Sequence, residues 1–360
     1  MSTVAGILNI NDAERAYVGV VGQELVFDAI NRVLAERNAE IAAATSVFVE
    51  SSTESFAKRY LLAGGGRLQA MGRQAPAAAV KRVGYYDVGF QLRMWGDEIG
   101  GSRVDMAYMS VAELDAHVKA VMTRDVNTMR DRILTALFEN TNLTFPDPIH
   151  GNVTVRRLAN TDGTLYTPVL GSETEADDEH YLNAGYAVAA IADDNNPALT
   201  LRNEIAEHFG GIGSFGKNFV YFHGADQTAY LQAITGFQAT RDIGIVDRYP
   251  DTVLAPFPSV PGRVHGRVTG VWLSEWDGYI PDTYGMCILL DAPAPLQMRV
   301  DPSDTGLGRG LQLVATSVTH PLYRASYEHR YGFGCGNRLS AACMLVTDGG
   351  TYVVPTAYAE

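Results

Sequence analysis

The stretch that decides the fold is residues 110–140, SVAELDAHVKAVMTRDVNTMRDRILTALFEN. Ser110 and Glu113 have the spacing of a capping box, in which two side chains satisfy the first free N–H groups of a helix. Apolar residues then recur at helical spacing over Leu114–Leu137, and the pattern ends before Pro146. It predicts a helix of about 28 to 30 residues, roughly 45 Å long, beyond the usual globular length.

The segment before this helix, residues 57–108, is rich in glycine and arginine. From Val88 to Trp95 apolar and other residues alternate, which predicts a strand with one apolar face. Gly100-Gly101 is a turn signal, and Val104–Met109 is predicted to return as the partner strand. A long hairpin of this kind buries little apolar surface by itself, so it needs another surface to lie on.

The remaining elements are shorter, and together they predict a mixed α+β fold without internal repeats. A helix with a modest apolar stripe is predicted from Gln23 to about Thr45. Further predictions are strand–turn–strand at 152–170, an acidic loop at 173–179, a strand at 186–191, a helix from Asn196-Pro197, a strand at 218–222, a helix at 226–236, and strands at 268–272, 286–290, 311–318 and 340–346.

Composition excludes several classes of protein. The 360-residue chain has a net charge of −13, which disfavours binding to nucleic acid or to anionic membranes. Only 19% of its residues are charged, below the usual quarter, so some surface is expected to be covered by other chains. Three cysteines without a CxxC pair fit a reducing compartment. The N-terminus does not resemble a secretory signal, and no apolar run is long enough to span a bilayer.

Gly211–Lys217 matches GxGxxG and nearly matches a phosphate-binding loop. Such a loop follows a strand and opens a helix, because the helix N-terminus holds the anion. Here the predicted order is reversed, and Asn218 replaces the Ser or Thr that would hold magnesium. A simple helix-to-strand connection is therefore favoured, with a nucleotide-using enzyme as the alternative. No cofactor and no catalytic residue is predicted.

The histidines and acids show no local metal-binding spacing. None of the histidines stands in HxH or HxxxH order, so no metal site is predicted, although separated ligands can converge. The acidic run Glu173–Glu179 lacks the spacing of a calcium loop and is interpreted as a solvated charge run. The eight histidines are His117, His150, His180, His208, His223, His265, His320 and His329.

A second glycine-rich segment, Glu328–Arg338, reads EHRYGFGCGNR. No helix opens after it, so a phosphate cradle is not favoured. Glycines alternating with larger residues are typical of a strand that another backbone approaches closely.

The order of these parts, with the Tyr331-Gly332-Phe333-Gly334 ending, resembles the major capsid proteins of tailed bacteriophages, which have the Hong Kong 97-type fold. The resemblance covers essentially the whole chain. It implies an N-terminal arm at 1–56, an extended β-hairpin loop at 57–108, a peripheral domain at 109–195 with the spine helix at 110–140, an axial domain at 196–319, and a return to the peripheral domain at 320–360.

The resemblance also implies a function. The chain would be a structural protein and not an enzyme, assembling as hexamers and pentamers into the icosahedral virion shell that encloses double-stranded DNA without binding it specifically. Assembly in the host cytoplasm, scaffolding, portal and decoration proteins as further partners, and no cleaved leader are expected. The alternative with the same fold is an encapsulin-type nanocompartment. Inter-subunit contacts are expected from the loop: Arg59, Arg67, Arg73, Lys81, Arg82, Arg93, Trp95 and Arg103.

Two expectations concern the loop in more detail. Its arginines would pair with acids near Glu173–Glu179 of a neighbouring copy. Some relatives crosslink a loop lysine to an asparagine; Lys81 would be the candidate, but crosslinking is not expected, so boiling in SDS should give a single 39 kDa band.

Overall fold

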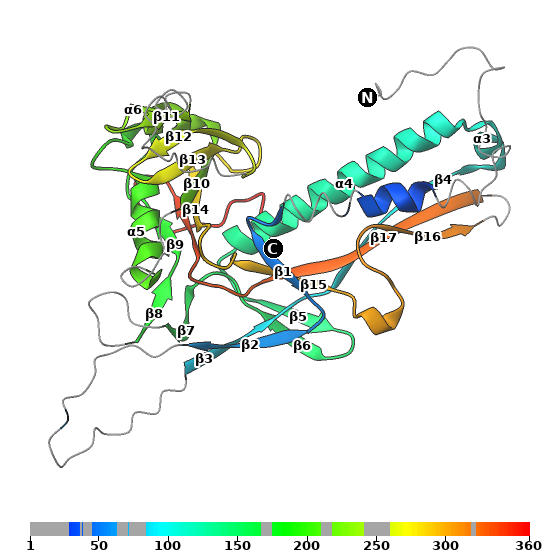
Figure 1. The fold of residues 1–360 in the computed structure, drawn as a ribbon, viewed down its shortest axis with the longest axis horizontal. Coiled ribbons are helices and arrows are strands. Elements are labelled where there is room, and N and C mark those ends of the chain that lie inside the picture. Colours follow the sequence, from blue (N-terminus) through cyan, green and yellow to red (C-terminus); the bar gives the residue numbers. More distant parts are fainter. Residues whose placement is uncertain are drawn as a thin grey trace, which may run out of the picture.

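The computed structural model describes residues 29–36, 38, 45–62, 71, 84–166, 175–209, 218–240, 260–317 and 322–360. The molecule is elongated (Figure 1). A seven-stranded sheet lies at one end, and the short helix α3 (Arg103–Tyr108) lies at the other. The long helix α4 (Val111–Phe138) runs between them. None of the helices in the described ranges is long and apolar enough to cross a membrane.

Helix α4 confirms the prediction made from its sequence. Ser110 is the N-cap, and the capping box with Glu113 is formed in both directions. The first half of α4 packs Leu114 and Val118 into a small core with Leu313 and Tyr327. The second half belongs to the main core through Met129, Ile133, Leu134, Leu137 and Phe138. The helix therefore connects two separate hydrophobic cores.

The seven-stranded sheet contains the most deeply buried strands of the chain. Helix α5 (Pro197–Phe209) covers one face, against which Phe219 and Tyr221 pack. Val220 and Phe222 point to the opposite face and join the core of α4. The strand order is β11 (Gln238–Ala239), β12 (Arg263–Val268), β13 (Val271–Glu275), β10 (Phe219–His223), β14 (Tyr284–Leu289), β18 (Ala341–Leu345) and β9 (Tyr181–Asn183).

A second sheet forms around β17 (Leu322–Cys335), the longest strand. Its first part lies between β16 (Gln312–Ser317) and β4 (Arg93–Ser102). Its last part pairs with β15 (Leu296–Val300), which pairs in turn with β1 (Val49–Thr53).

The close approach predicted for the glycines of β17 is confirmed. A Cβ atom at Gly332 would lie 2.3 Å from the carbonyl oxygen of Gln91, and one at Gly334 would lie 2.8 Å from that of Gly89. Tyr331 and Phe333, on the other face of the strand, are completely buried in the main core.

Two-stranded ribbons, short helices and the helical residues 29–36, which lie within the helix predicted from Gln23 to about Thr45, complete the described structure. The ribbons are β2 (Ala57–Leu62) with β3 (Gly84–Gly89), β5 (Leu143–Asp147) with β6 (Gly151–Val155), and β7 (Asn160–Tyr166) with β8 (Ala176–Glu179). The short helices besides α3 are η2 (Val188–Ala190), η3 (Ala225–Gln227), α6 (Thr228–Ala233) and η5 (Ser303–Thr305).

The predicted hairpin partner at Val104–Met109 is wrong. Residues Arg103–Tyr108 are helical, because Ser102 and Asp105 form a second capping box, with the Ser102 Oγ accepting from the Asp105 N–H at 3.1 Å. Strand β4 instead pairs with β17, which is more than 200 residues away in the sequence.

Three shorter predictions are also wrong. Residues 186–191 contain a 3₁₀ turn and not a strand, and residues 176–179 of the predicted acidic loop form strand β8. The predicted strand 268–272 is interrupted by a turn at Thr269 and Gly270, which both have positive φ. The other strands and helices predicted downstream of residue 196 are present.

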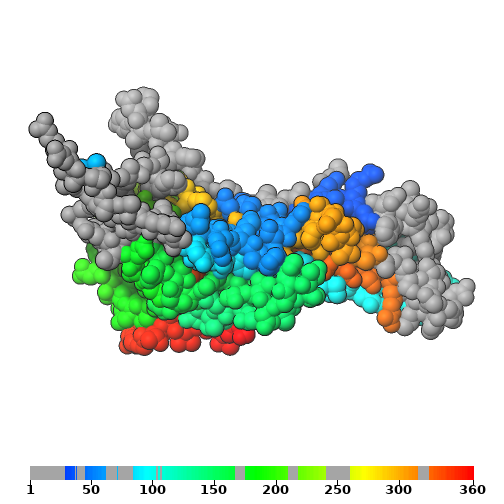
Figure 2. Space-filling model, turned by 90° about the horizontal axis from the view of Figure 1, so that it is seen from below, coloured from blue at the N-terminus to red at the C-terminus, as the bar shows by residue number. Residues whose placement is uncertain are grey.

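Figure 2 shows the molecule as a thick slab, with β2 (blue), the ribbon β5–β6 (green) and the C-terminal segment (red) in successive bands.

The C-terminal segment is fixed to the end of α4. The Tyr352 hydroxyl donates to the carbonyl oxygen of Phe138 at 2.8 Å, and Tyr358 stacks on the Phe138 ring.

Candidate inter-subunit contact surfaces

The ribbon β2–β3 has one buried and one exposed face. Tyr86 and Val88 point inward, where they form a small core with Phe90. Leu61 and Tyr85 are 78% and 48% exposed. A two-stranded ribbon is marginal by itself, and exposed apolar side chains on it mark a surface suited to contact with another chain.

Arg59 is used within this ribbon. It lies directly opposite Asp87, with Nε–Oδ1 and Nη2–Oδ2 distances of 2.7 and 2.8 Å. The hydrogen bond from Arg59 lowers the pKa of Asp87. The guanidinium also lies 4.1 Å from the centre of the Tyr85 ring. Arg59 therefore joins the two strands, and its contact with a neighbouring copy stays a prediction.

The structure places Arg93 and Trp95 at the inner end of β4. Arg93 Nη1 lies 3.6 Å from Glu360 Oε1. Trp95 packs against the main core, next to Tyr331 and beneath the guanidinium of Arg132. Both residues thus contact their own chain, and their predicted inter-subunit role is untested.

The structure does not describe the side chains of the other five predicted contact residues. Arg103 is the first residue of α3, and only its backbone is described. Arg67, Arg73, Lys81 and Arg82 lie outside the described residues.

A second exposed apolar surface, near the α3 end, was not anticipated. It consists of Val104 and Tyr108 in α3 and Val314 in β16, which are 63%, 69% and 52% exposed. Met94, at the inner end of β4, is a separate exposed apolar side chain (64%) and continues the alternating apolar face that begins at Val88. Of that face, the first two side chains, Val88 and Phe90, are buried within this chain.

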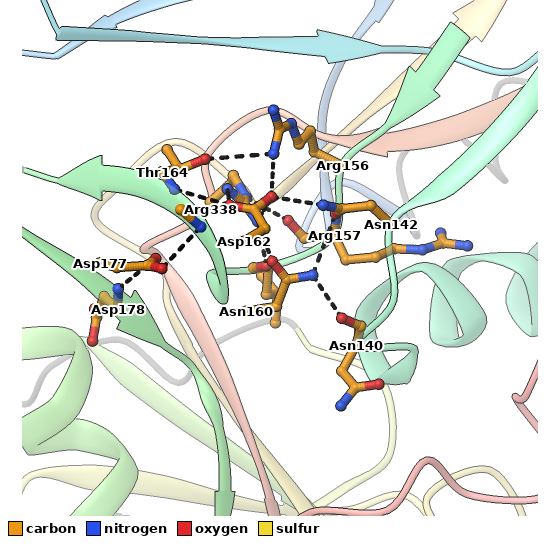
Figure 3. Close-up of polar contacts among 12 residues, drawn as sticks. Asn140, Asn142, Arg156, Arg157, Asn160, Asp162, Thr164, Asp177, Asp178 and Arg338 are labelled. Carbon is orange, nitrogen blue, oxygen red and sulfur yellow. Dashed lines mark hydrogen bonds and ion pairs between the residues drawn. The ribbon is translucent and has the colours of Figure 1, made fainter. Parts of the chain in front are cut away.

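A buried polar network organises the ribbon β7–β8 (Figure 3). Its centre is Arg338, which is fully buried in the link from β17 to β18. Arg338 donates to the carbonyl oxygens of Arg157 and Leu158 at 2.7 and 3.0 Å, to Asn160 Oδ1 at 2.8 Å, and to both oxygens of Asp162.

Asp162 receives further bonds in this network. Asn142 Nδ2 donates to it at 2.6 Å, and Arg156 forms an ion pair with it. Burial by itself raises the pKa of Asp162, but bonds from Thr164 and Asn142 and the charge of Arg338 hold it far below the usual value. The network therefore fixes β7 to the end of α4 and to the β17–β18 link.

The acidic run after β7 is not a simple solvated charge run. Asp177 accepts a hydrogen bond from the Gly163 N–H at 2.9 Å. Asp178 faces two buried histidines, His180 and His208. Glu179 has a raised pKa, first because of burial and then because of the charges of Asp178 and Asp177. Sequence reasoning missed this pairing because the two histidines are 28 residues apart in the chain.

The glycine motif Gly211–Lys217 lies outside the described residues. Its flanks are described: helix α5 precedes it and strand β10 follows it. The reversed order predicted from the sequence is therefore confirmed.

The sequence matches no family model and no curated protein. Solved structures do match. A structure from Mycobacterium phage Patience is 16% identical, with a TM-score of 0.68, and the alignment covers 100% of this chain and 98% of that chain. The capsid of a native GTA particle is 11% identical with a TM-score of 0.48, covering 85% and 90% of the two chains. The mature capsid of bacteriophage PhiM1 is 9% identical with a TM-score of 0.48, covering 84% and 86%.

The likeness to the phage Patience structure extends over both chains almost completely. The chain has the Hong Kong 97-type fold of phage major capsid proteins.

Proposed function

We propose that the chain is a phage major capsid protein, which assembles as hexamers and pentamers into an icosahedral shell around the phage genome. The observation that carries this proposal is the fold of the whole chain, matched from end to end by a phage structure. Closed shells of one protein need symmetric rings of subunits with large contacts. The two exposed apolar surfaces described above lie at separate places on an elongated molecule, as such contacts require.

The division predicted from the sequence is part of this proposal. The arm at 1–56 and the loop at 57–108 would lie across neighbouring copies, while 109–195 with 320–360 and 196–319 would form the peripheral and axial domains. The net charge of −13 suits a container, because an inner wall that repels DNA does not hinder its packaging or release. The virion is the proposed location, and scaffolding, portal and decoration proteins are the proposed further partners.

Electron microscopy of the negatively stained, purified chain tests the proposal. Closed particles of uniform size support it, and a small compact oligomer contradicts it. A nanocompartment of the same fold would instead enclose a cargo protein that co-purifies with the particles. Boiling the particles in SDS should return a single 39 kDa band, since no crosslink through Lys81 is proposed.

A further inference from the structure

Three side chains from two separate segments converge next to the seven-stranded sheet. Asp178 is in β8, His180 lies between β8 and β9, and His208 is in the last turn of α5. The side chains of His180 and His208 are 0% and 3% exposed, and that of Asp178 is 20% exposed. Figure 1 shows α5 beside β9, with β8 beyond the end of the helix.

The three side chains direct one atom each toward a common point. Asp178 Oδ2 lies 2.7 Å from His208 Nε2 and 3.1 Å from His180 Nε2, and the two nitrogens are 3.3 Å apart. In a tetrahedral zinc site with bonds of about 2.0–2.1 Å, neighbouring ligand atoms lie about 3.3 Å apart. The triangle of atoms is therefore close to one face of such a site.

Hydrogen bonding fixes the orientation of His180. Its Nδ1 lies 2.7 Å from the carbonyl oxygen of Ala341, which only accepts, so Nδ1 carries the proton. The Nε2 of the neutral ring then presents a lone pair to the cluster. A histidine whose other nitrogen donates to a carbonyl is the usual arrangement at a metal, because that bond sets the tautomer and the ring orientation.

Protons alone do not satisfy this cluster in its neutral form. Oδ2 of Asp178 and Nε2 of His180 are both acceptors, yet they lie 3.1 Å apart. If His208 carries its proton on Nε2, that single proton serves one of its two neighbours. If the proton is on Nδ1, it makes no hydrogen bond, because this buried nitrogen has no partner. A bound cation would satisfy all three facing atoms at once.

Two further carboxylates stand beside the triangle. Glu204 and Glu207 are on the same turn of α5 as His208, and their oxygens lie within 4.8 Å of each other and of Asp178. Three acids held this closely repel one another unless a positive charge lies among them. Glu207 Oε1 is 3.8 Å from His208 Nε2, but Glu204 and Glu207 form a group with Asp178 that is separate from the two histidines.

We propose that Asp178, His180 and His208 bind one zinc ion, with water as the fourth ligand. Two imidazoles with a carboxylate are a ligand set that suits zinc. The ligands come from the β8–β9 segment and from α5, so the ion would tie the ribbon β7–β8 to the helix that covers the sheet. This role does not depend on whether the chain builds a shell.

The experiment is zinc binding by the chain after removal of metal with EDTA. Zinc sulfate is added back, unbound metal is removed by gel filtration, and bound zinc is counted by mass spectrometry. About one zinc per chain is expected, and zinc should raise the thermal unfolding temperature. Cobalt in place of zinc should give the intense visible absorption of a tetrahedral site, a signature that needs no variant.

The variants are His208→Asn and Asp178→Asn, with His117→Asn, an exposed histidine on α4, as the matched control. Removing a ligand should weaken zinc binding by more than the roughly 10- to 100-fold lost with an outer hydrogen-bond partner. The control should bind as the unaltered chain does. The proposal is overturned if the unaltered chain retains no zinc and gives no cobalt spectrum, or if both folded ligand variants bind zinc as tightly as the control. In the first case, a second proton on His180 bonded to Asp178 would account for the cluster.

Discussion

At the scale of single residues, the interior is held by a few buried charged side chains that form ion pairs. Arg299 in β15 donates to Asp147 at 2.7 Å and to the carbonyl oxygen of Phe90 at 2.9 Å. The other oxygen of Asp147 accepts the N–H groups of Ile149 and His150. This pair joins the ribbon β5–β6 to the sheet around β17.

Asp147→Asn should lower the free energy of unfolding by about 3–5 kcal/mol, because it leaves the Arg299 charge buried without a counter-charge. Denaturant unfolding of the unassembled chain measures this. The control is Asp115→Asn, which removes an exposed ion pair with Lys119 on α4 and should cost less than about 1 kcal/mol. Equal losses of unfolding free energy in the two variants would show that the buried ion pair stabilises the fold no more than the exposed one.

His223 gives a pH dependence. Its ring is completely buried, Nδ1 faces the carbonyl oxygen of Gly224 at 2.9 Å, and Nε2 has no partner. Burial, and to a lesser extent the nearby His265, lower the pKa of His223 from 6.5 to about 4. The unfolded chain therefore binds a proton between these two values that the folded chain does not.

The stability contributed by neutral His223 is complete above pH 6.5 and is lost as the pH falls toward 4, by about 3 kcal/mol in all. Unfolding free energies measured across this range should fall in the unaltered chain and in His117→Gln. In His223→Gln the fall should be smaller by that amount. A parallel pH profile in all three proteins would contradict the assignment.

Part of this residue-scale picture was visible in the sequence and part was not. The cap residues Ser110 and Asn196 act on neighbours within four positions, so their roles follow from local spacing. Arg338 finds its partners about 180 residues away, and His180 meets His208 across a ribbon and a helix. Only the folded chain brings such groups together.

At the scale of elements, one face of strand β17 carries glycines, Gly332 and Gly334, so another backbone can approach it closely. Gly332→Ala would place a methyl group 2.3 Å from the carbonyl oxygen of Gln91. The backbone between β3 and β4 would have to move, so the variant should lose about 1–3 kcal/mol of unfolding free energy. Arg324→Ala, at an exposed position of the same strand, is the control. A variant at Gly332 as stable as this control would show that the two backbones are not held so closely.

The same strand shows why helices were predicted better than strand partners. Helix α4 depends on a cap and a repeating pattern that lie within its own residues. The alternation over Val88–Trp95 predicted one strand, but the structure has two, β3 and β4, which are separated at residues 90–92. The pattern also did not predict that β3 pairs with β2 and β4 with β17. Strand pairing is set by contacts between distant segments, which one local pattern does not specify.

The loop at 57–108 carries a prediction about assembly. Arg67→Glu or Arg73→Glu should block particle formation or make it sensitive to salt, because the arginines are proposed to pair with acids of a neighbouring copy. The yield of particles at increasing salt, measured by sedimentation, tests this. Lys119→Glu on the exposed side of α4 is the control. Normal, salt-independent particles from both loop variants would rule out the pairing.

At the scale of the whole molecule, helix α4 connects a core beneath its first half with the main core at its end. The C-terminal segment closes the junction: Glu360 forms ion pairs with Arg132 and Arg157 at 3.2 and 2.5 Å. These contacts join the C-terminus to α4 and to the β6–β7 link, whereas the apolar side chains Leu61 and Tyr108 are exposed. The exposure of Tyr108 became apparent only in the structure, because the sequence pattern predicted a strand where α3 forms.

The central claim is that the extended parts of the chain become stable only against neighbouring copies. Hydrogen exchange of the ribbon β2–β3, compared between assembled particles and dissociated subunits, tests it most directly. We predict that amides of residues 57–62 and 84–89 exchange fast in subunits and slowly in particles, while those of α4 and β10 are protected in both. Equal, strong protection of the ribbon in isolated subunits, or a chain that forms no particles, would contradict the account.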